Sequence, residues 1–363
     1  MKINRSLYLP WVLIALTIFL RFYHLYQFAG FSWDQAQLLA YPVNHLIVNH
    51  KLTLVGPYTG PGGIYLGPLL YYLAAPLFWI FNLHPIAGSV LASILGITTA
   101  LGVYLLFKKF FTQNVALAGL VIYATSPLLN INDRTIWNPS LIPLASLGIL
   151  AVFLAWYKYH QVTFLNLSFL ATSIALGIQA HLGFLFTLPL SLIIFLQLKP
   201  ARLTLLKALW FIAIFIFWFT PLIVFDLRHQ GINSANFIHF FFSPDNQASF
   251  NVFNFLGKSI SLLQSQLQLI GSMLIFSSLN YFNLIAGIIL TLLATGFLLS
   301  SHPALIKLFF SYLIIFAAGF GLYHGNIPEY YLWPILSPAV LMLALLIDSL
   351  SRRFRFSLNI FIS

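Results

Sequence analysis

The sequence predicts an all-α polytopic membrane protein in which residues 1–363 form a single transmembrane domain of about ten helices. Hydrophobic residues make up 60% and charged residues 6% of the chain, and the mean hydropathy is +0.93. Too little polar surface is left to cover a soluble globule of 363 residues. Apolar runs of about 20 residues recur, which is the length that crosses a bilayer. Most basic residues fall in the short segments on one predicted side, as the positive-inside rule describes.

The charge and the missing cysteines exclude several classes of function. The formal net charge is +11, but the cations lie singly or in short clusters between apolar runs, without the basic stripe of a nucleic-acid-binding face. We therefore predict the lipid bilayer as a partner, and no nucleic acid. The chain has no cysteine, which excludes disulfides, thiol nucleophiles and cysteine-ligated zinc.

The first predicted span runs from Leu7 to about Leu25 and follows Lys2 and Arg5. These are the flanks of a signal peptide, but the apolar run is longer than a typical signal core and no convincing small-x-small cleavage site follows it. We expect an uncleaved span with the N-terminus in the cytoplasm.

The first outer loop is predicted over residues 27–85, and it contains an ambiguous apolar segment from Ile64 to Phe81. This segment is apolar enough to cross the membrane, yet it contains Pro68 and Pro76, each of which removes a backbone donor. If it crossed, the basic loop LLFKKFF after the next span would lie outside, and every later basic loop would invert. The sequence therefore favours an interfacial or re-entrant helix on the outer side.

The remaining spans alternate along the rest of the chain, and both termini are expected in the cytoplasm. They are predicted at roughly Ile86 to Phe107, Val115 to Leu129, Leu141 to Trp156, Phe164 to Gln179, Leu182 to Leu198, Ala208 to Phe225, Tyr281 to Leu299, Ala304 to Tyr323 and Leu332 to Leu350. A second long outer loop covers residues 226–280, and its segment LGKSISLLQSQLQLIGSMLIF has the pattern of an amphipathic helix at the interface.

This topology separates the charges. Six residues are acidic, and five of them are predicted on the outer face: Asp34, Asp133, Asp226, Asp245 and Glu329. Most of the Lys and Arg residues fall on the cytoplasmic face. Carboxylates that are so scarce and so unevenly placed indicate chemistry on the extracytoplasmic side.

Asp34 lies in FAGFSWDQAQLLAYP, shortly after the first span and at the start of a predicted surface helix from Gln35 to Asn49. Aspartate is a favoured helix N-cap, and its charge suits the helix dipole. The functional alternative is a general base that takes a proton from an acceptor hydroxyl. The two interpretations are compatible, and both stay open at this point.

Asp133 and Arg134 lie in NINDRTIWNPS, between two spans on the outer side. They could form a tight turn in which the carboxylate caps locally and the arginine reaches lipid headgroups. Alternatively, the guanidinium could bind a phosphate through two hydrogen bonds. The sequence does not decide between these interpretations.

Three other outer segments supply candidate substrate-binding residues. His181 falls at an outer turn, Asp226 and Arg228 follow another helix end, and Lys51 lies in the first outer loop. A histidine at a turn is more often solvated than a ligand, and the Asp226 and Arg228 side chains could simply pair at the surface, which stabilises by about 0 to 1 kcal/mol. The predicted topology nevertheless places all these groups at one depth, where a substrate phosphate would lie.

The motifs give no dedicated metal site. His45 and His50 do not have the i, i+4 spacing of a zinc-binding helix, and the chain has no D-x-D pair. No cofactor is predicted with certainty, and a divalent cation is left open. Glu329, Tyr330 and Tyr331 at another helix start are interpreted as an aromatic belt with a helix-start carboxylate.

The sequence resembles the GT-C class of lipid-linked-sugar glycosyltransferases, especially family 39, which includes protein O-mannosyltransferases and aminoarabinose transferases. The resemblance rests on Arg21 in FLRFYHL, on Asp34 in FSWDQA, on the Pro-rich YLGPLLYYLAAPLFWIFNLHP, and on the basic loop LLFKKFF. It covers mainly the first 200 residues. Gln35 stands where the family often has Glu, a departure that bears on any second carboxylate or metal role at that position.

The resemblance implies a GT-C-like bundle with juxtamembrane helices in its first extracytoplasmic loop. It also implies a polyprenyl-phosphate-linked sugar as donor and a lipid, glycan or protein hydroxyl as acceptor. Transfer would be inverting, with Asp34 as general base and with Arg134 and Arg228 as clamps on the departing phosphate.

Two other classes of function remain as alternatives. A transporter or flippase for a lipid-linked or anionic solute would be expected to have ionisable residues near the membrane midplane and broken helices in paired halves, whereas the predicted span centres here are almost uncharged. A non-catalytic membrane scaffold would tolerate replacement of the outer carboxylates.

Overall fold

The structure is a computed structural model that describes residues 8–59, 61–242, 251–275, 280–323 and 325–354. These ranges are helical apart from short connections and two isolated bridges, Tyr58 to Tyr65 and Gln161 to Ala201. Asp245, Lys2, Arg5 and Arg355 lie outside the described residues.

The helices of the first half are α1 (Leu9–Phe22), α2 (Leu25–Phe28), α3 (Trp33–Gln35), α4 (Tyr41–Asn49), α5 (Leu69–Ile80), α6 (Ile86–Phe110), α7 (Gln113–Thr125), α8 (Pro127–Asn132), α9 (Ile142–Tyr159) and α10 (Phe164–Ala180). Those of the second half are α11 (Thr187–Leu198), α12 (Leu205–Arg228), α13 (Ile232–Phe242), α14 (Val252–Ser272), α15 (Tyr281–Leu298), α16 (Pro303–Gly321) and α17 (Leu336–Arg353). Short 3-10 turns lead into α9, α11 and α17.

The predicted class of fold is confirmed: the protein is an all-α integral membrane protein. Within the described ranges, six helices are long and apolar enough to cross a membrane, and five apolar helices are shorter. The ten predicted spans correspond to α1, α6, α7, α9, α10, α11, α12, α15, α16 and α17.

One predicted span is divided in the structure. The segment Val115 to Leu129 contains most of α7 and the start of α8, with a non-helical residue, Ser126, between them. Pro127 has no N–H to continue the α7 ladder, and the Ser126 hydroxyl accepts a hydrogen bond from the Leu129 N–H at 3.4 Å, which begins the new helix. The break turns the chain toward the Asp133 loop.

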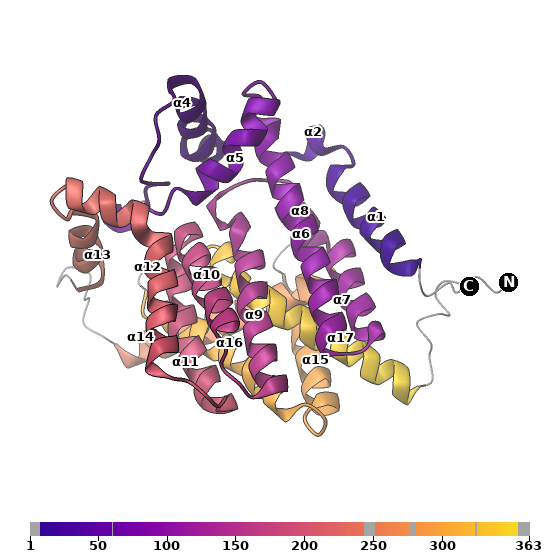
Figure 1. Ribbon diagram of the computed structural model, residues 1–363. Coiled ribbons are helices and arrows are strands. Elements are labelled where there is room, and N and C mark those ends of the chain that lie inside the picture. Colours follow the sequence, from indigo (N-terminus) through magenta and orange to yellow (C-terminus); the bar gives the residue numbers. More distant parts are fainter. Residues whose placement is uncertain (1–7, 60, 243–250, 276–279, 324, 355–363) are drawn as a thin grey trace.

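The ambiguous apolar segment forms α5, a helix of 12 residues with Pro76 inside it. Twelve residues rise about 18 Å, against the roughly 30 Å of a bilayer core. The helix packs against α4 and α6, and Figure 1 shows α4 and α5 together at one end of the bundle. Because α7 and α11 are similarly short, length alone does not decide the placement of α5, and its interfacial or re-entrant position stays a prediction.

The last four helices form a closely packed group. The amphipathic segment predicted after residue 250 is α14, and its buried face packs against α15 and α16. A Cβ atom on Gly287 would lie 1.8 Å from the Leu267 carbonyl oxygen, and one on Gly271 would lie 2.0 Å from the Asn283 carbonyl oxygen. These glycines therefore let the α14 and α15 backbones touch, as small residues do between membrane helices.

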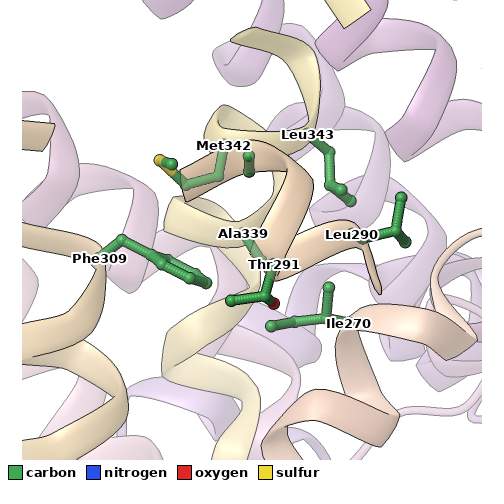
Figure 2. A pocket seen from close by; sticks show the side chains of 8 residues that line it. Ile270, Leu290, Thr291, Phe309, Ala339, Met342 and Leu343 are labelled. Carbon is green, nitrogen blue, oxygen red and sulfur yellow. The ribbon is translucent and has the colours of Figure 1, made fainter. Parts of the chain in front are cut away.

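Two hollows lie within this group, and neither is lined by a charged residue. The smaller, of about 10 Å³, lies where α14, α15, α16 and α17 meet (Figure 2). The larger is an apolar groove of about 300 Å³ between α14, α15 and α16. Thr291 lines both hollows, and the remaining lining side chains are aliphatic or aromatic, apart from the thioether of Met342 in the smaller one. Neither hollow therefore offers a charged group to a substrate.

The cations gather at one end of the bundle. Lys158 Nζ donates to the Lys109 carbonyl at 3.1 Å, and the ring of Phe111 lies 6.3 Å from that of His302. Lys207 Nζ donates to the carbonyl of Val162 at 2.7 Å. These contacts join the ends of α6, α9, α12 and α16 into a basic end. The opposite end carries Asp34 and is called the Asp34 end below.

Candidate functional site

The Asp34 end is built around a buried ion pair between Arg21 and Asp133. Arg21, in the last turn of α1, is 0% exposed. Its Nε and Nη2 atoms each lie 2.9 Å from Oδ2 of Asp133, and its other donors reach the carbonyls of Tyr123 and Ala124 and the side chain of Asn130. Every donor of the guanidinium is directed at the α7–α8 region, so this group fixes the end of α1 against it.

Asp133 is therefore already engaged by the protein. Its carboxylate reaches across to α1 instead of capping its own turn, which makes the predicted local cap wrong. Burial raises the pKa of Asp133 to about 6, while the Arg21 guanidinium acts in the opposite direction. A Cβ atom on Gly96 would lie 2.2 Å from Asp133 Oδ2, so α6 must have a glycine at this position.

Arg134 lies beside the ion pair and adds a second guanidinium group, so the group of three side chains has a net positive charge. Its Nη2 donates to the Leu20 carbonyl, and its guanidinium lies 5.2 Å from the centre of the Phe28 ring. Its Nε is buried and has no hydrogen-bond partner among the described residues. Burial lowers the pKa of Arg134, and the neighbouring Arg21 lowers it further. Two guanidinium groups and one carboxylate leave one positive charge here, which an anion would neutralise.

Asp34 is the free carboxylate of this end. The sequence predicts a helix from Gln35, but in the structure it starts at Trp33. Ser32 occupies the N-cap position of this helix, and the Ser32 N–H donates to Gln35 Oε1 at 2.8 Å. The prediction that Asp34 caps this helix is therefore wrong. Asp34 lies in the first turn, is exposed, and accepts no hydrogen bond from the described residues. Gln35 is buried and is used in the cap.

A cluster of rings at the same end is made of Trp137, His181, Tyr330 and Tyr331. Burial raises the pKa of the Tyr330 phenol, and the charge of the Asp34 carboxylate raises it further, so Asp34 lies within electrostatic range of the cluster. The Trp137 and Tyr330 ring centres are 4.9 Å apart, and those of His181 and Tyr331 are 4.1 Å apart. The sequence places these tyrosines in an aromatic belt and assigns Trp137 no role. The Glu-Tyr-Tyr triplet at a helix start is the signal that could have identified them.

His181 is a neutral hydrogen-bonding group in this cluster. Burial lowers its pKa from 6.5 to about 4, so the imidazole is uncharged at neutral pH. Its Nδ1 accepts a hydrogen bond from the Gly183 N–H at 3.0 Å, which places the proton on Nε2. His181 can therefore donate a hydrogen bond to a substrate, but it adds no positive charge for a phosphate.

Asp226 and Arg228 belong to another part of the molecule. Asp226 accepts hydrogen bonds from the N–H groups of Asn233 and Ser234, at 2.8 Å and 3.2 Å, and so caps α13 rather than pairing with Arg228. Arg228 and Lys51 are exposed. No hydrogen bond or ion pair among the described residues joins Asp226 or Arg228 to Asp34.

Loop 56–67 connects the two regions. Asn233 Oδ1 accepts a hydrogen bond from the Tyr65 N–H at 2.7 Å, so the loop is attached to α13. A Cβ atom on Gly67 would lie 2.0 Å from Gln179 Oε1, two residues before His181. His181 belongs to the cluster of rings, and the charge of Asp34 acts on Tyr330 in that cluster. Asp226 is connected to this end only through the loop. The convergence of all these groups on one substrate stays a prediction.

The described part of the chain holds no group of three or more His, Asp and Glu side chains placed to hold a metal ion. The divalent cation that the sequence leaves open therefore has no assigned ligands within these ranges.

Comparison with known proteins reveals the fold. No protein-family model matches the sequence, and no curated protein matches it. Among solved structures, the chain is similar to ArnT from Cupriavidus metallidurans bound to undecaprenyl phosphate, with a TM-score of 0.67 and 14% identity over 95% of this chain and 61% of that one.

The chain is also similar to the oligosaccharyltransferase of Archaeoglobus fulgidus. The complex with zinc and sulfate gives a TM-score of 0.53 and 14% identity over 97% of this chain and 50% of that one. The complex of AglB with an inhibitory peptide and a dolichol-phosphate gives 0.51 and 16% over 97% and 51%. The chain thus spans about three fifths of ArnT and half of AglB. The GT-C fold is confirmed, whereas membership of family 39 stays a prediction.

Proposed function

We propose that the protein is an inverting membrane glycosyltransferase that moves a sugar from a polyprenyl-phosphate donor to an acceptor hydroxyl at the extracytoplasmic face. The observation that carries this proposal is Asp34, an exposed carboxylate with no hydrogen bond from the described residues. It lies at the same end of a GT-C fold as the excess positive charge of Arg134. ArnT, which has this fold, was solved with undecaprenyl phosphate.

The roles follow from the chemistry of the groups. The acceptor oxygen attacks the anomeric carbon while its proton passes to the Asp34 carboxylate. The bond between the anomeric carbon and the phosphate oxygen breaks, and the phosphate leaves with the electron pair. Arg134 stabilises the charge that develops on this phosphate. The exposed cations Arg228 and Lys51 attract the anionic donor from further away.

Asp133 and Asp226 take supporting roles in this proposal. The carboxylate of Asp133 holds Arg21, and that of Asp226 holds α13. Neither is left free to bind a substrate cation or hydroxyl. The basic residues at the opposite end of the bundle support a cytoplasmic location for that end, and therefore an extracytoplasmic location for the Asp34 end. Acceptors of three kinds fit this chemistry: lipid, glycan and protein hydroxyls.

The test is a transfer assay with the full-length protein in lipid nanodiscs. A panel of undecaprenyl-phosphate sugars is incubated with a membrane extract as acceptor source, and release of undecaprenyl phosphate is followed. Asp34→Asn should reduce release by about 10² to 10⁴ without changing membrane insertion. Gln37→Ala, an exposed residue three positions further on, is the control and should leave release unchanged. Release that survives in Asp34→Asn contradicts the proposal.

A further inference from the structure

We infer that Trp137, His181, Tyr330 and Tyr331 hold the sugar ring of the donor and favour a sugar without a carboxylate. The inference rests on the proposed function and names the class of sugar that this end of the protein accepts. These four residues are called the ring cluster below.

The ring cluster brings together three segments that are far apart in sequence. Trp137 precedes the turn into α9, His181 follows α10, and the two tyrosines precede α17. The Trp137 and Tyr330 rings are 4.9 Å apart at 56°, and the Tyr330 and Tyr331 rings are 5.0 Å apart at 57°. All four side chains remain partly exposed, whereas Trp333 beneath them is 3% exposed. The cluster is therefore a surface with a packed floor.

Such a surface suits one face of a sugar. Aromatic faces carry partial negative charge, and ring edges carry partial positive charge. The axial C–H groups on one face of a pyranose carry partial positive charge and are apolar enough to leave water, so they rest on an aromatic face. An ordinary aromatic belt needs only separate rings at the membrane surface. Rings from three segments packed at 4 to 5 Å form a preorganised platform instead.

The polar groups at the edge of the platform suit sugar hydroxyls. His181 Nε2–H is a donor with no acceptor among the described residues, because Nδ1 already accepts from the Gly183 N–H. Asp34, within electrostatic range of Tyr330, is an acceptor. A sugar hydroxyl both donates and accepts, so it can use either group. Because the charge of Asp34 acts on Tyr330, the proposed base and the platform belong to the same end of the protein, where the acceptor hydroxyl has to meet the sugar.

The charges around the platform set the preference. A sugar carboxylate would lie near the Asp34 carboxylate and would be repelled. The ring cluster contains no Lys or Arg, and His181 is neutral at pH 7. Lys258 donates hydrogen bonds to the carbonyls of Tyr323 and Gly325, which are not part of the ring cluster. Neutral and amino sugars therefore fit, and uronic acids do not.

Equilibrium binding to the full-length protein in nanodiscs tests the inference without any acceptor. The probes are undecaprenyl phosphate, undecaprenyl-phosphate mannose and undecaprenyl-phosphate glucuronate. The mannose lipid should bind about tenfold more tightly than the bare lipid phosphate, as a good stacking contact of roughly 1.4 kcal/mol would give. The glucuronate lipid should gain nothing over the bare lipid.

Variants assign the gain to the ring cluster. Tyr330→Leu and Trp137→Leu should each remove most of the tenfold gain without changing the affinity for bare undecaprenyl phosphate. Tyr330→Phe and Trp137→Phe keep the ring and should keep the gain, which excludes misfolding as the cause. Tyr159→Leu changes an exposed ring at the basic end and is the control.

The outcomes separate this inference from the proposed function. If the mannose and bare lipids bind equally, or if the leucine variants weaken both lipids alike, the inference is overturned while the donor class stands. If the glucuronate lipid binds as tightly as the mannose lipid, the stated preference is overturned. If none of the three lipids binds, the proposed function falls as well.

Discussion

Arg21 and Asp133 are 112 positions apart in sequence, yet their side chains meet at 2.9 Å in the interior of the protein. The pair joins the end of α1 to the loop that follows α8. That loop also carries Arg134, and Thr135 in it accepts a hydrogen bond at 3.3 Å from Gly30, four residues before Asp34. The loop held by this pair thus carries the proposed phosphate clamp and contacts the segment just before the proposed base.

Breaking this pair should destabilise the protein strongly. Asp133→Asn leaves the Arg21 charge buried without a counter-ion, and losing one partner of a buried pair typically costs about 3 to 5 kcal/mol. Arg21→Met should cost a similar amount. The double variant should be less unstable than the sum of the two, because no lone charge remains. Thermal unfolding in detergent measures all three, and additive losses would show that the two residues are not coupled.

Arg134 should control donor binding rather than folding. Arg134→Gln should raise the KM for the donor about tenfold or more, since it removes the local positive charge and its hydrogen bonds to phosphate. Arg134→Lys should recover only part of the loss, because an ammonium group cannot bind phosphate through two parallel bonds. Arg228→Gln, at an exposed position, should have a smaller effect that disappears at high salt. A larger effect at Arg228 would reverse these assignments.

The low pKa of His181, about 4, makes a prediction about pH and stability. The unfolded chain takes up a proton near pH 6.5 that the folded protein does not accept until about pH 4. This residue therefore contributes a loss of stability as the pH falls from about 6.5 to 4, up to about 3 kcal/mol. The free energy of unfolding, measured at several pH values, should depend more strongly on pH in the wild type than in His181→Gln. Parallel curves would contradict the low pKa.

Two glycines of α15 should respond in opposite ways to alanine. At Gly287 the added methyl group would lie 1.8 Å from the Leu267 carbonyl oxygen, so α14 and α15 must separate. At Gly296 the added group would meet no atom of the described residues within 4 Å, apart from its chain neighbours and the nearby backbone of its own helix. Alanine is favoured over glycine in a helix by up to about 1 kcal/mol. Gly296→Ala should therefore leave the melting temperature unchanged or raise it, and Gly287→Ala should lower it. Equal melting temperatures would mean that the helices do not touch there.

The sequence by itself determined the helical spans and the scarcity of acids, because hydropathy and helix length are local properties of the chain. All ten predicted spans correspond to helices. The placement of the short α5 outside the membrane core stays a prediction from the distribution of basic residues. Asp34 could be singled out as a candidate base from its position after the first span, although its predicted cap is made by Ser32.

The tertiary structure decided which polar groups are free. Asp133 and Asp226 have the same residue type as Asp34, but the first is held by Arg21 and the second by the backbone of α13. Trp137, His181 and Tyr330 meet only because three distant segments fold together. A buried polar group must find a partner to offset the water it loses. The identity of that partner depends on how the helices pack, which no local pattern in the sequence encodes.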